Sequence, residues 1–315
     1  MSVASVVPAN KYKNYSLTRD FVEGISILLK QRIITSVILI PLALGLVFYT
    51  PLEWFSYAAA GLVMLGAWEW ASFMGLQKAP QRLGFVALIG AILAALNLYW
   101  PIESLWQQGK LVADANYLLT LAFAWWLVAT ALVWSYPKSA AAWHKGLLMR
   151  AIAGVLTLIP LWLALNALRS AQYQQSELYG SVLIMAVLGI VWCADIGAYF
   201  VGKNLGKHKL MPLVSPNKTI EGLLGGLTSS AVFAVIFCYF ADVDASKWAY
   251  FAVIAVIVAL FSAVGDLLES MFKREAGLKD SGRCLPGHGG ILDRIDSLTS
   301  ATPIFVALYA WTLSL

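Results

Sequence analysis

The chain has 315 residues, of which 60% are hydrophobic and only 12% are charged, and its formal net charge is +5. Soluble domains carry about 25% charged residues, so the composition excludes an ordinary soluble globule and indicates that lipid solvates much of the chain. The basic excess suits anionic lipid headgroups and anionic substrates. Because the basic residues are spread over many short loops, we do not expect nucleic acid as a partner.

The predicted elements begin with a polar stretch, residues 1–32, which we expect to be a cytoplasmic extension. Within it, residues 20–32 form either a short helix on the membrane surface or an ordinary polar lead-in. Nine apolar stretches follow, and each is close to the roughly 20 residues that a spanning helix needs. They are residues 33–50, 54–75, 83–100, 116–135, 151–168, 178–200, 220–240, 248–268 and 298–314. The predicted fold is all-α, a polytopic membrane protein with about nine transmembrane helices.

The distribution of Lys and Arg predicts the orientation of these helices. With a cytoplasmic N-terminus, 19 of the 22 Lys and Arg residues lie on the inner side, and only Lys110, Arg169 and Lys247 lie outside. This asymmetry follows the rule that inner loops are the more basic ones. We therefore expect three regions: the extension 1–32, an N-terminal transmembrane half 33–176 and a C-terminal catalytic half 177–315.

Acidic residues mark the functional end of the predicted bundle. A charge at the centre of a spanning helix costs about 2.5–3.5 kcal/mol, so such residues need partners or a wet cavity. In the predicted orientation, the acids in or beside the apolar stretches all lie near the cytoplasmic boundary; they are Glu69, Asp195, Glu221, Asp266, Glu269, Asp293 and Asp296. An acid near a helix end can also simply reach water. Glu69, alone between two Trp residues, is better explained as a packing or ion-pair residue.

Spacing favours a metal site for the other acids. Asp266, Glu269 and Lys273 lie on one face of a continued helix, and Asp293 and Asp296 share a face after the next loop. Two acid-bearing helix ends on either side of a polar loop would form an oxygen cage for a hard cation. Mg²⁺ binds to one or two carboxylates together with substrate phosphates.

Two polar loops are suited to phosphate. Residues 201–222 contain four Lys residues, hydroxyls at Ser215 and Thr219, and a helix start near Thr219, where free N–H groups can bind an anion. Taken alone, the same segment is equally an ordinary basic loop. Residues 270–297 contain a glycine-rich turn around His288 and several cationic side chains. His288 could be a general acid or base, a phosphate donor or a turn residue; we favour the last two, because the expected attacking group is already an anion.

These loops carry a family resemblance. The segment 270–296 resembles the signature of the phosphatidate cytidylyltransferases (CDP-diacylglycerol synthases). The matching positions are Ser270, Lys273-Arg274, Lys279-Asp280, Pro286, His288-Gly289-Gly290, Asp293-Arg294 and Asp296. The segment 195–222 is also similar, through Asp195 to Tyr199, Gly206 to Lys209 and Ser215 to Thr219. Together the two segments cover roughly the C-terminal 120 residues.

The resemblance implies a multi-pass enzyme of the bacterial inner membrane whose active site faces the cytoplasm. It would make CDP-diacylglycerol and pyrophosphate from CTP and phosphatidic acid, and it would be a homodimer among membrane lipids. Mg²⁺ is the expected cofactor, and a second cation is compatible with the site. The implied metal ligands are Asp266 and Asp293, then Asp195, Glu269 and Asp296. The implied catalytic residues are Asp266, Asp293, Lys273, Arg294 and His288. The implied substrate-binding residues are Ser215, Asn217, Lys218, Thr219, Lys273, Arg274, Lys279, Gly289 and Arg294.

Two other functions remain to be compared with this one. A transporter for an anionic substrate would also place acids in the membrane, although such sites usually lie near the midplane between two related halves. Another lipid-phosphate enzyme, such as a polyprenol kinase or a sugar-phosphate transferase, would use the same metal and phosphate chemistry. A structural scaffold is the least favoured alternative, because acids within apolar spans cost insertion energy.

Overall fold

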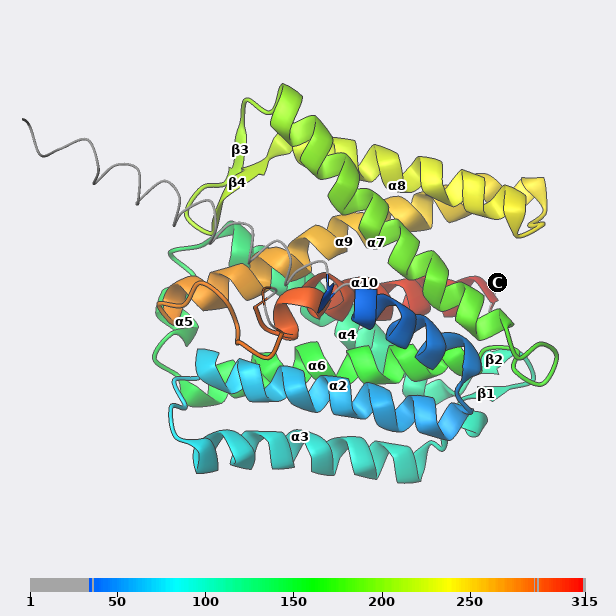
Figure 1. Ribbon diagram of the computed structural model, residues 1–315, viewed down its shortest axis with the longest axis horizontal. Helices are drawn as coiled ribbons and strands as arrows, with labels where there is room; N and C mark the ends of the chain where they lie inside the picture. The colour runs from blue at the N-terminus through cyan, green and yellow to red at the C-terminus, as the bar shows by residue number, and fades with distance from the viewer. Residues whose placement is uncertain (1–33, 36, 286, 288, 314–315) are drawn as a thin grey trace, which may run out of the picture.

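The computed structural model describes residues 34–35, 37–285, 287 and 289–313 (Figure 1). The surface helix considered for residues 20–32 lies outside this range. The long helices are Val37–Tyr49, α2 (Leu52–Phe73), α3 (Ala79–Tyr99), α4 (Ala113–Trp134), α6 (Leu147–Ser170), α7 (Tyr179–Leu205), α8 (Ile220–Phe240), α9 (Trp248–Glu275) and α10 (Leu292–Leu313). Two short hairpins, β1–β2 (Trp106–Gln107, Lys110–Leu111) and β3–β4 (Lys209–Met211, Ser215–Thr219), and the short helix α5 (Ala140–Trp143) connect them.

Each of the nine apolar stretches contains a helix in the described part of the chain, and the all-α membrane class is confirmed. Six helical segments there are long and apolar enough to cross a membrane: α3, α4, α6, α7, α8 and the segment Ala245–Glu275 that contains α9. The helix Val37–Tyr49 is apolar but shorter than these. The helices α2 and α10 are not among the six, because both include polar side chains that the protein itself encloses.

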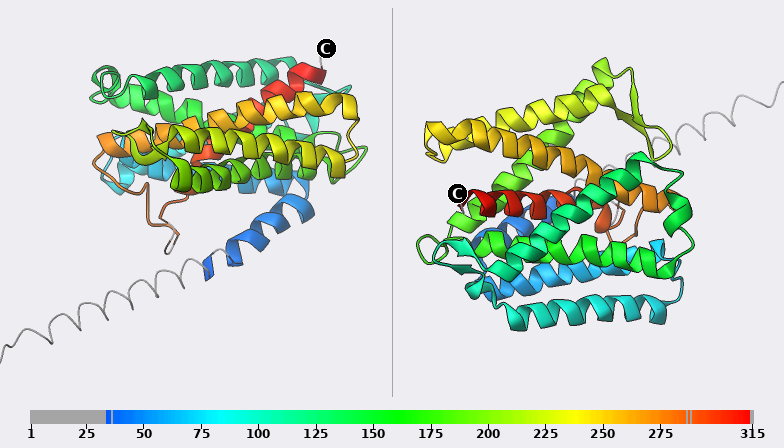
Figure 2. Two further views of the ribbon diagram at one scale, coloured as in Figure 1. Left: turned by 90° about the horizontal axis from the view of Figure 1, so that it is seen from above. Right: turned by 180° about the vertical axis from the view of Figure 1, so that it is seen from behind.

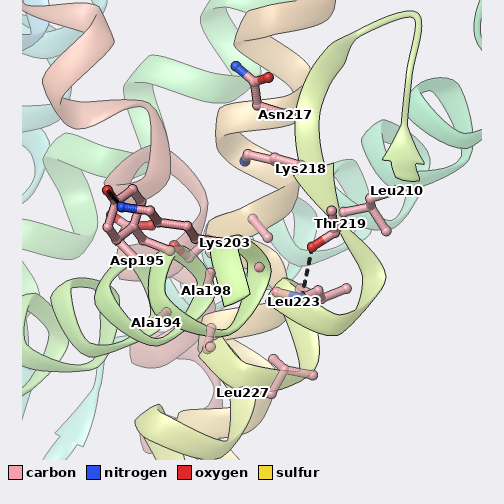
Figure 3. Close-up of a pocket in the computed structure, with 17 residues that line it drawn as sticks. Ala194, Asp195, Ala198, Lys203, Leu210, Asn217, Lys218, Thr219, Leu223 and Leu227 are labelled. Atoms are coloured by element: carbon pink, nitrogen blue, oxygen red, sulfur yellow. Dashed lines mark hydrogen bonds between the residues drawn. The ribbon is translucent and has the colours of Figure 1, made fainter. Parts of the chain in front are cut away.

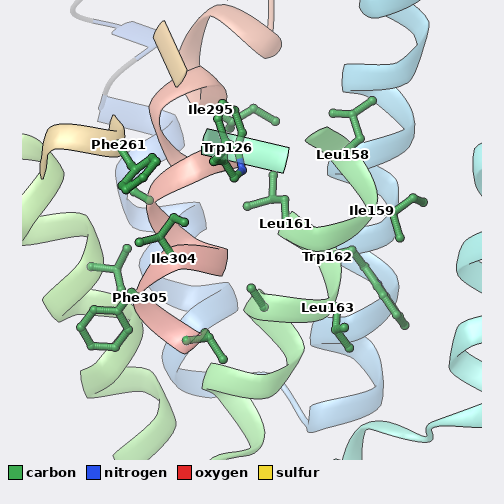
Figure 4. Packing of buried hydrophobic residues seen from close by; sticks show 14 of the residues in the cluster. Trp126, Leu158, Ile159, Leu161, Trp162, Leu163, Phe261, Ile295, Ile304 and Phe305 are labelled. Atoms are coloured by element: carbon green, nitrogen blue, oxygen red, sulfur yellow. The ribbon is translucent and has the colours of Figure 1, made fainter. Parts of the chain in front are cut away.

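The helix α10 lies at the centre of the bundle. Trp126 of α4, Leu161 of α6 and Phe261 of α9 pack around Ile304 and Phe305 of α10 in the core seen in Figure 4. Thr299, Ser300 and Thr302 of α10 are buried as well. Since protein rather than lipid surrounds this helix, its polar residues can bond within the fold, as Ser300 Oγ does to the Phe261 carbonyl at 2.7 Å.

The helices α7 and α8 approach each other through glycines. A Cβ at Gly197 would lie 2.7 Å from the Gly225 carbonyl, and one at Gly226 would lie 2.7 Å from the Ala194 carbonyl. Small residues at such positions allow two helix backbones to come together within a membrane. This close contact fixes α8 beside the part of α7 that bears Asp195.

The connecting segments gather at two opposite ends of the bundle (Figures 1 and 2). One end holds α5, the β3–β4 hairpin and the segments 276–285 and 289–291, whereas the other holds β1–β2 and the segments 171–178 and 241–247. Long antiparallel helices joined by short connections produce this arrangement. The basic loops 201–219 and 269–297 are therefore neighbours in space.

Candidate active site

A cavity of about 490 Å³ lies between α7, α8, α9 and the β3–β4 hairpin (Figure 3). Its α8 wall is mostly apolar and includes Leu223 and Leu227. The helix α7 contributes Asp195 and Lys203, and the hairpin contributes Lys218 together with its neighbours Asn217 and Thr219. A cavity with one apolar wall and several charged groups is suited to a molecule that has both a lipid part and an anionic part.

The hairpin β3–β4 places Lys218 against the acidic face of α9. Lys218 Nζ lies 2.6 Å from Asp266 Oδ2, and both side chains are about one-third exposed or less. Ser270 Oγ donates to Asp266 Oδ1 at 3.2 Å, as the spacing of four residues on α9 predicts. The helix α9 continues to Glu275, so the predicted shared face of Asp266, Glu269 and Lys273 is confirmed.

A second lysine joins α9 to α10. Lys273 Nζ lies 2.6 Å from Glu269 Oε2 and 2.7 Å from Asp293 Oδ1, and its side chain is only 10% exposed. The helix α10 begins at Leu292, six residues before the predicted span, so Asp293 lies in its first turn. The two acid-bearing helix ends inferred from the sequence are therefore in direct contact through one ammonium group.

The remaining predicted acids complete one cluster. Asp195 and Asp296 each lie within electrostatic range of the Asp266 carboxylate. In the described ranges, no set of three or more His, Cys, Asp or Glu side chains has the geometry of a metal site. The donor set nevertheless fits a hard cation. Five carboxyl groups lie here, at positions 195, 266, 269, 293 and 296, but only two lysines, Lys218 and Lys273, pair with them. The buried Glu269 Oε1 also receives no hydrogen bond from the described residues. Such a surplus of carboxylate oxygens suits a hard cation.

The segment before α10 is held by an acid from the other half of the chain. Glu69 of α2, only 1% exposed, accepts hydrogen bonds from Ser281 Oγ at 3.0 Å, Ile291 N at 3.0 Å and Leu292 N at 2.7 Å. It thus satisfies N–H groups at the start of α10 that have no partner within the helix. From the sequence, Glu69 is only an isolated acid between two Trp residues. Local sequence patterns could not predict its role, because its partners lie more than 200 residues away.

The Asp293 carboxylate is fixed in a similar way. Its Oδ2 accepts hydrogen bonds from Ser281 N at 3.0 Å and from Gly290 N at 2.8 Å, while its Oδ1 faces Lys273. Gly289 has a φ of +81°, a conformation that favours glycine, which explains its place in the turn. Pro286 and His288 lie outside the described residues, so the alternatives for His288 stay predictions.

Other predicted substrate-binding residues line or flank the site. Thr219 is the N-cap of α8, as expected, and its Oγ1 accepts a hydrogen bond from Gly222 N at 3.1 Å. Ser215 is half-buried and Asn217 is exposed in β4. Exposed cationic side chains at the same end of the bundle are Arg274, Lys279 and Arg294.

Two further contacts position the loops around the site. Glu221 accepts hydrogen bonds from the backbone N–H groups of Lys207 and His208, and one of its oxygens lies 2.6 Å from His208 Nδ1, which ties the segment before β3 to α8. Arg274 Nε donates to the Val214 carbonyl at 3.1 Å and links α9 to the turn of the hairpin.

Cys284 lies near Glu69 and is exposed. Partial burial of the thiol raises its pKa, and the hydrogen bond and charge of the Glu69 carboxylate raise it further.

The fold and the site together define a helical membrane protein with paired lysines and carboxylates beside a partly apolar cavity. Residues 30–312 match the Cytidylyltransferase family, and the chain belongs to that family. It is 41% identical over 290 residues to a phosphatidate cytidylyltransferase of Haemophilus influenzae, which covers 91% of this chain and 100% of the relative. It is 42% identical over 281 residues to a protein of the same name from Pseudomonas aeruginosa, covering 89% and 97% of the two chains.

Proposed function

We propose that this chain is a phosphatidate cytidylyltransferase, which converts CTP and phosphatidate to CDP-diacylglycerol and pyrophosphate. The observation that carries the proposal is the pairing of Lys218, which lines a cavity with an apolar wall, with Asp266, together with the pairing of Lys273 with Asp293 farther along α9. The names of its relatives support the same activity, since those relatives align with the chain over most of their length.

The chemistry of the reaction suits these residues. A phosphate oxygen of phosphatidate attacks the α-phosphorus of CTP, and the bond from that phosphorus to the oxygen bridging to the β-phosphorus breaks, so pyrophosphate leaves. Both reactants are anions, and their mutual repulsion is the main electrostatic obstacle. Lys218 and Lys273 reduce this repulsion by binding phosphate oxygens, and the reaction then needs mostly positioning and charge stabilisation. No general base is needed, because the attacking oxygen is already ionised.

The cavity offers separate walls for the apolar part of phosphatidate and for the phosphate groups. The apolar α8 wall at Leu223 and Leu227 would hold the first part of the diacylglycerol, while Lys203 and Lys218 would bind the phosphate groups. The exposed cations Arg274, Lys279 and Arg294 at the same end would receive the triphosphate from water. In this arrangement the lipid enters from the bilayer and CTP from the aqueous side.

A divalent cation belongs to this proposal. Asp266 and Asp293 would hold Mg²⁺, with Asp195, Glu269 and Asp296 near enough to assist or to hold a second cation. When bound, the ion supplies charge neutralisation for the phosphate oxygens. Lys218 and Lys273 contact these two carboxylates and so hold them in place.

The membrane arrangement is also part of the proposal. We infer nine spans, a cytoplasmic N-terminus, an active site facing the cytoplasm and a location in the bacterial inner membrane. Support comes from the basic segments 203–218 and 273–294, which lie at one end of the bundle together with α5. The homodimer implied by the resemblance stays a proposal.

Two radioactive labels test the activity against its rivals. The purified protein is given phosphatidate, Mg²⁺ and CTP labelled at either the α- or the γ-phosphate. Cytidylyl transfer puts the α label into the lipid and the γ label into pyrophosphate. A kinase would put the γ label into lipid, and a transporter would yield no labelled lipid at all. Reactions without phosphatidate, and with a polyprenol in its place, are the controls.

A further inference from the structure

We propose that Glu69 is a positioning residue for the reaction, because it holds Ser281, Ile291 and Leu292 so that Asp293 faces Lys273. This inference rests on the proposed function. Glu69 belongs to α2, in the N-terminal half, and lies outside both segments that resemble the family signature. Its hydrogen bonds go to Ser281, Ile291 and Leu292, so its influence on the reaction passes through the residues that it holds.

A short chain of hydrogen bonds connects Glu69 to the site. Glu69 Oε2 accepts from Ser281 Oγ at 3.0 Å, and the backbone N–H of Ser281 donates to Asp293 Oδ2 at 3.0 Å. In return, Asp293 N donates to Ser281 Oγ at 3.3 Å. Ser281 is 4% exposed, so water does not compete freely for these groups. Asp293 Oδ1 is then directed at Lys273 Nζ, 2.7 Å away.

The chemistry of this position requires a carboxylate. The partners of Glu69 are all donors: the Ser281 hydroxyl, the N–H groups of Ile291 and Leu292, and the Cys284 thiol. The positive end of the α10 dipole adds a further attraction for an anion. A Gln at position 69 would turn an NH₂ group toward one of these donors, leaving at least one buried group without its bond.

The backbone around Glu69 is adapted to receive it. A Cβ at Gly282 would collide with Glu69 Oε1, and one at Gly290 would collide with Glu69 Oε2. Both glycines lie in the segment that Glu69 holds. The close approach of this segment to one buried side chain indicates that the loop is built around Glu69, rather than Glu69 filling a gap beside the loop.

The expected kinetic result is a loss of turnover rather than of binding. Residues that orient a catalytic group change activity by about 10–100-fold when replaced. The lysines that bind phosphate stay in place, so the KM values for CTP and phosphatidate should change by no more than about threefold. A residue that served only global stability would lower the melting temperature and leave kcat per folded molecule unchanged.

The test compares Glu69→Gln, Glu69→Asp and Ser281→Ala with the control Ser56→Ala. Ser56 is also a buried, hydrogen-bonded residue of α2, but its Oγ donates to Asn97, away from the site. For each purified variant, one measures kcat, both KM values, the melting temperature and hydrogen exchange of residues 281–292. We expect Glu69→Gln and Ser281→Ala to lower kcat about 10–100-fold and to speed exchange in the segment. Glu69→Asp should recover part of kcat, and Ser56→Ala should resemble the wild type.

Unchanged kcat in a folded Glu69→Gln protein, or unchanged exchange in residues 281–292, would overturn the inference. If Glu69→Gln yields no folded protein, Ser281→Ala decides alone, because it breaks the same chain of hydrogen bonds by removing one hydroxyl. A wild-type protein that makes no CDP-diacylglycerol would refute the proposed function itself. An active wild type with unaffected variants would refute only the role of Glu69.

Discussion

Lys273 is the residue on which the two halves of the acidic cluster depend. Its ammonium group lies within 2.7 Å of both Glu269 and Asp293, whose side chains are 3% and 9% exposed. Removing one partner of a buried ion pair leaves an uncompensated charge and costs about 3–5 kcal/mol. We therefore predict that Lys273→Met lowers the free energy of unfolding by about this amount, measured by denaturation in detergent. The exposed Lys247→Met is the control and should unfold like the wild type.

Cys284 reports on Glu69 without an activity assay. Partial burial, and then the hydrogen bond and charge of Glu69, raise the pKa of the Cys284 thiol. Removing that charge in Glu69→Gln lowers the thiol pKa, so a larger fraction is thiolate at pH 7 and maleimide labelling is faster. When the rate of maleimide labelling is plotted from pH 6 to 9, the curve for Glu69→Gln should lie at lower pH than the curve for the wild type. A curve that stays in place would mean that Glu69 does not act on this thiol.

At the level of elements, the contact between α7 and α8 shapes the cavity. A side chain at Gly197 would meet the Gly225 backbone and Ser229, whereas nothing lies within 4 Å of a Cβ at Gly61. Overpacking typically costs about 1–3 kcal/mol. Gly197→Val should therefore lower stability by that amount and raise the KM for phosphatidate, because α8 moves away from α7. Gly61→Val is the matched control, and equal behaviour of the two variants would contradict this role.

Local sequence patterns predicted some elements of the site but not others. The spacing of Asp266, Glu269 and Lys273 was enough to place them on one face of α9, because helical periodicity is a local property. The sequence predicts only a loop where the β3–β4 hairpin lies, because Ser215 to Thr219 carries no alternating pattern. The role of Glu69 had no local sign either, as its partners lie more than 200 residues away. The lysine between Glu269 and Asp293 likewise depends on how α9 and α10 pack.

At the scale of the whole molecule, the composition predicts the membrane class. The distribution of Lys and Arg predicts which connecting segments share one end of the bundle. Helices lie at all nine predicted positions in the described residues, yet only six segments are apolar and long enough by themselves. The other three helices are Val37–Tyr49, which is shorter, and α2 and α10, which contain buried polar residues such as Glu69 and Thr302. Enclosure by other helices permits such polar residues but does not require them, since α6 is 72% buried over its apolar stretch and is still among the six.

The proposed orientation predicts which loops are accessible from each side of the membrane. After Cys193, Cys238 and Cys284 are all replaced by Ser, single cysteines are introduced at Lys145, beside α5, and at Lys110 of β2, two exposed positions at opposite ends of the bundle. In intact spheroplasts, an impermeant maleimide should label Lys110→Cys at once and Lys145→Cys only after lysis. The reverse pattern would invert the topology.

The central claim is that Asp266 and Asp293 act together at one site for cytidylyl transfer. Its most direct test is pyrophosphate release by purified protein that depends on both CTP and phosphatidate, measured for Asp266→Asn and Asp293→Asn. We predict that each rate falls by about 100-fold or more while the protein stays folded, and that Asp244→Asn, an exposed acid in the connection between α8 and α9, keeps the wild-type rate. A wild-type rate in either site variant would contradict the account.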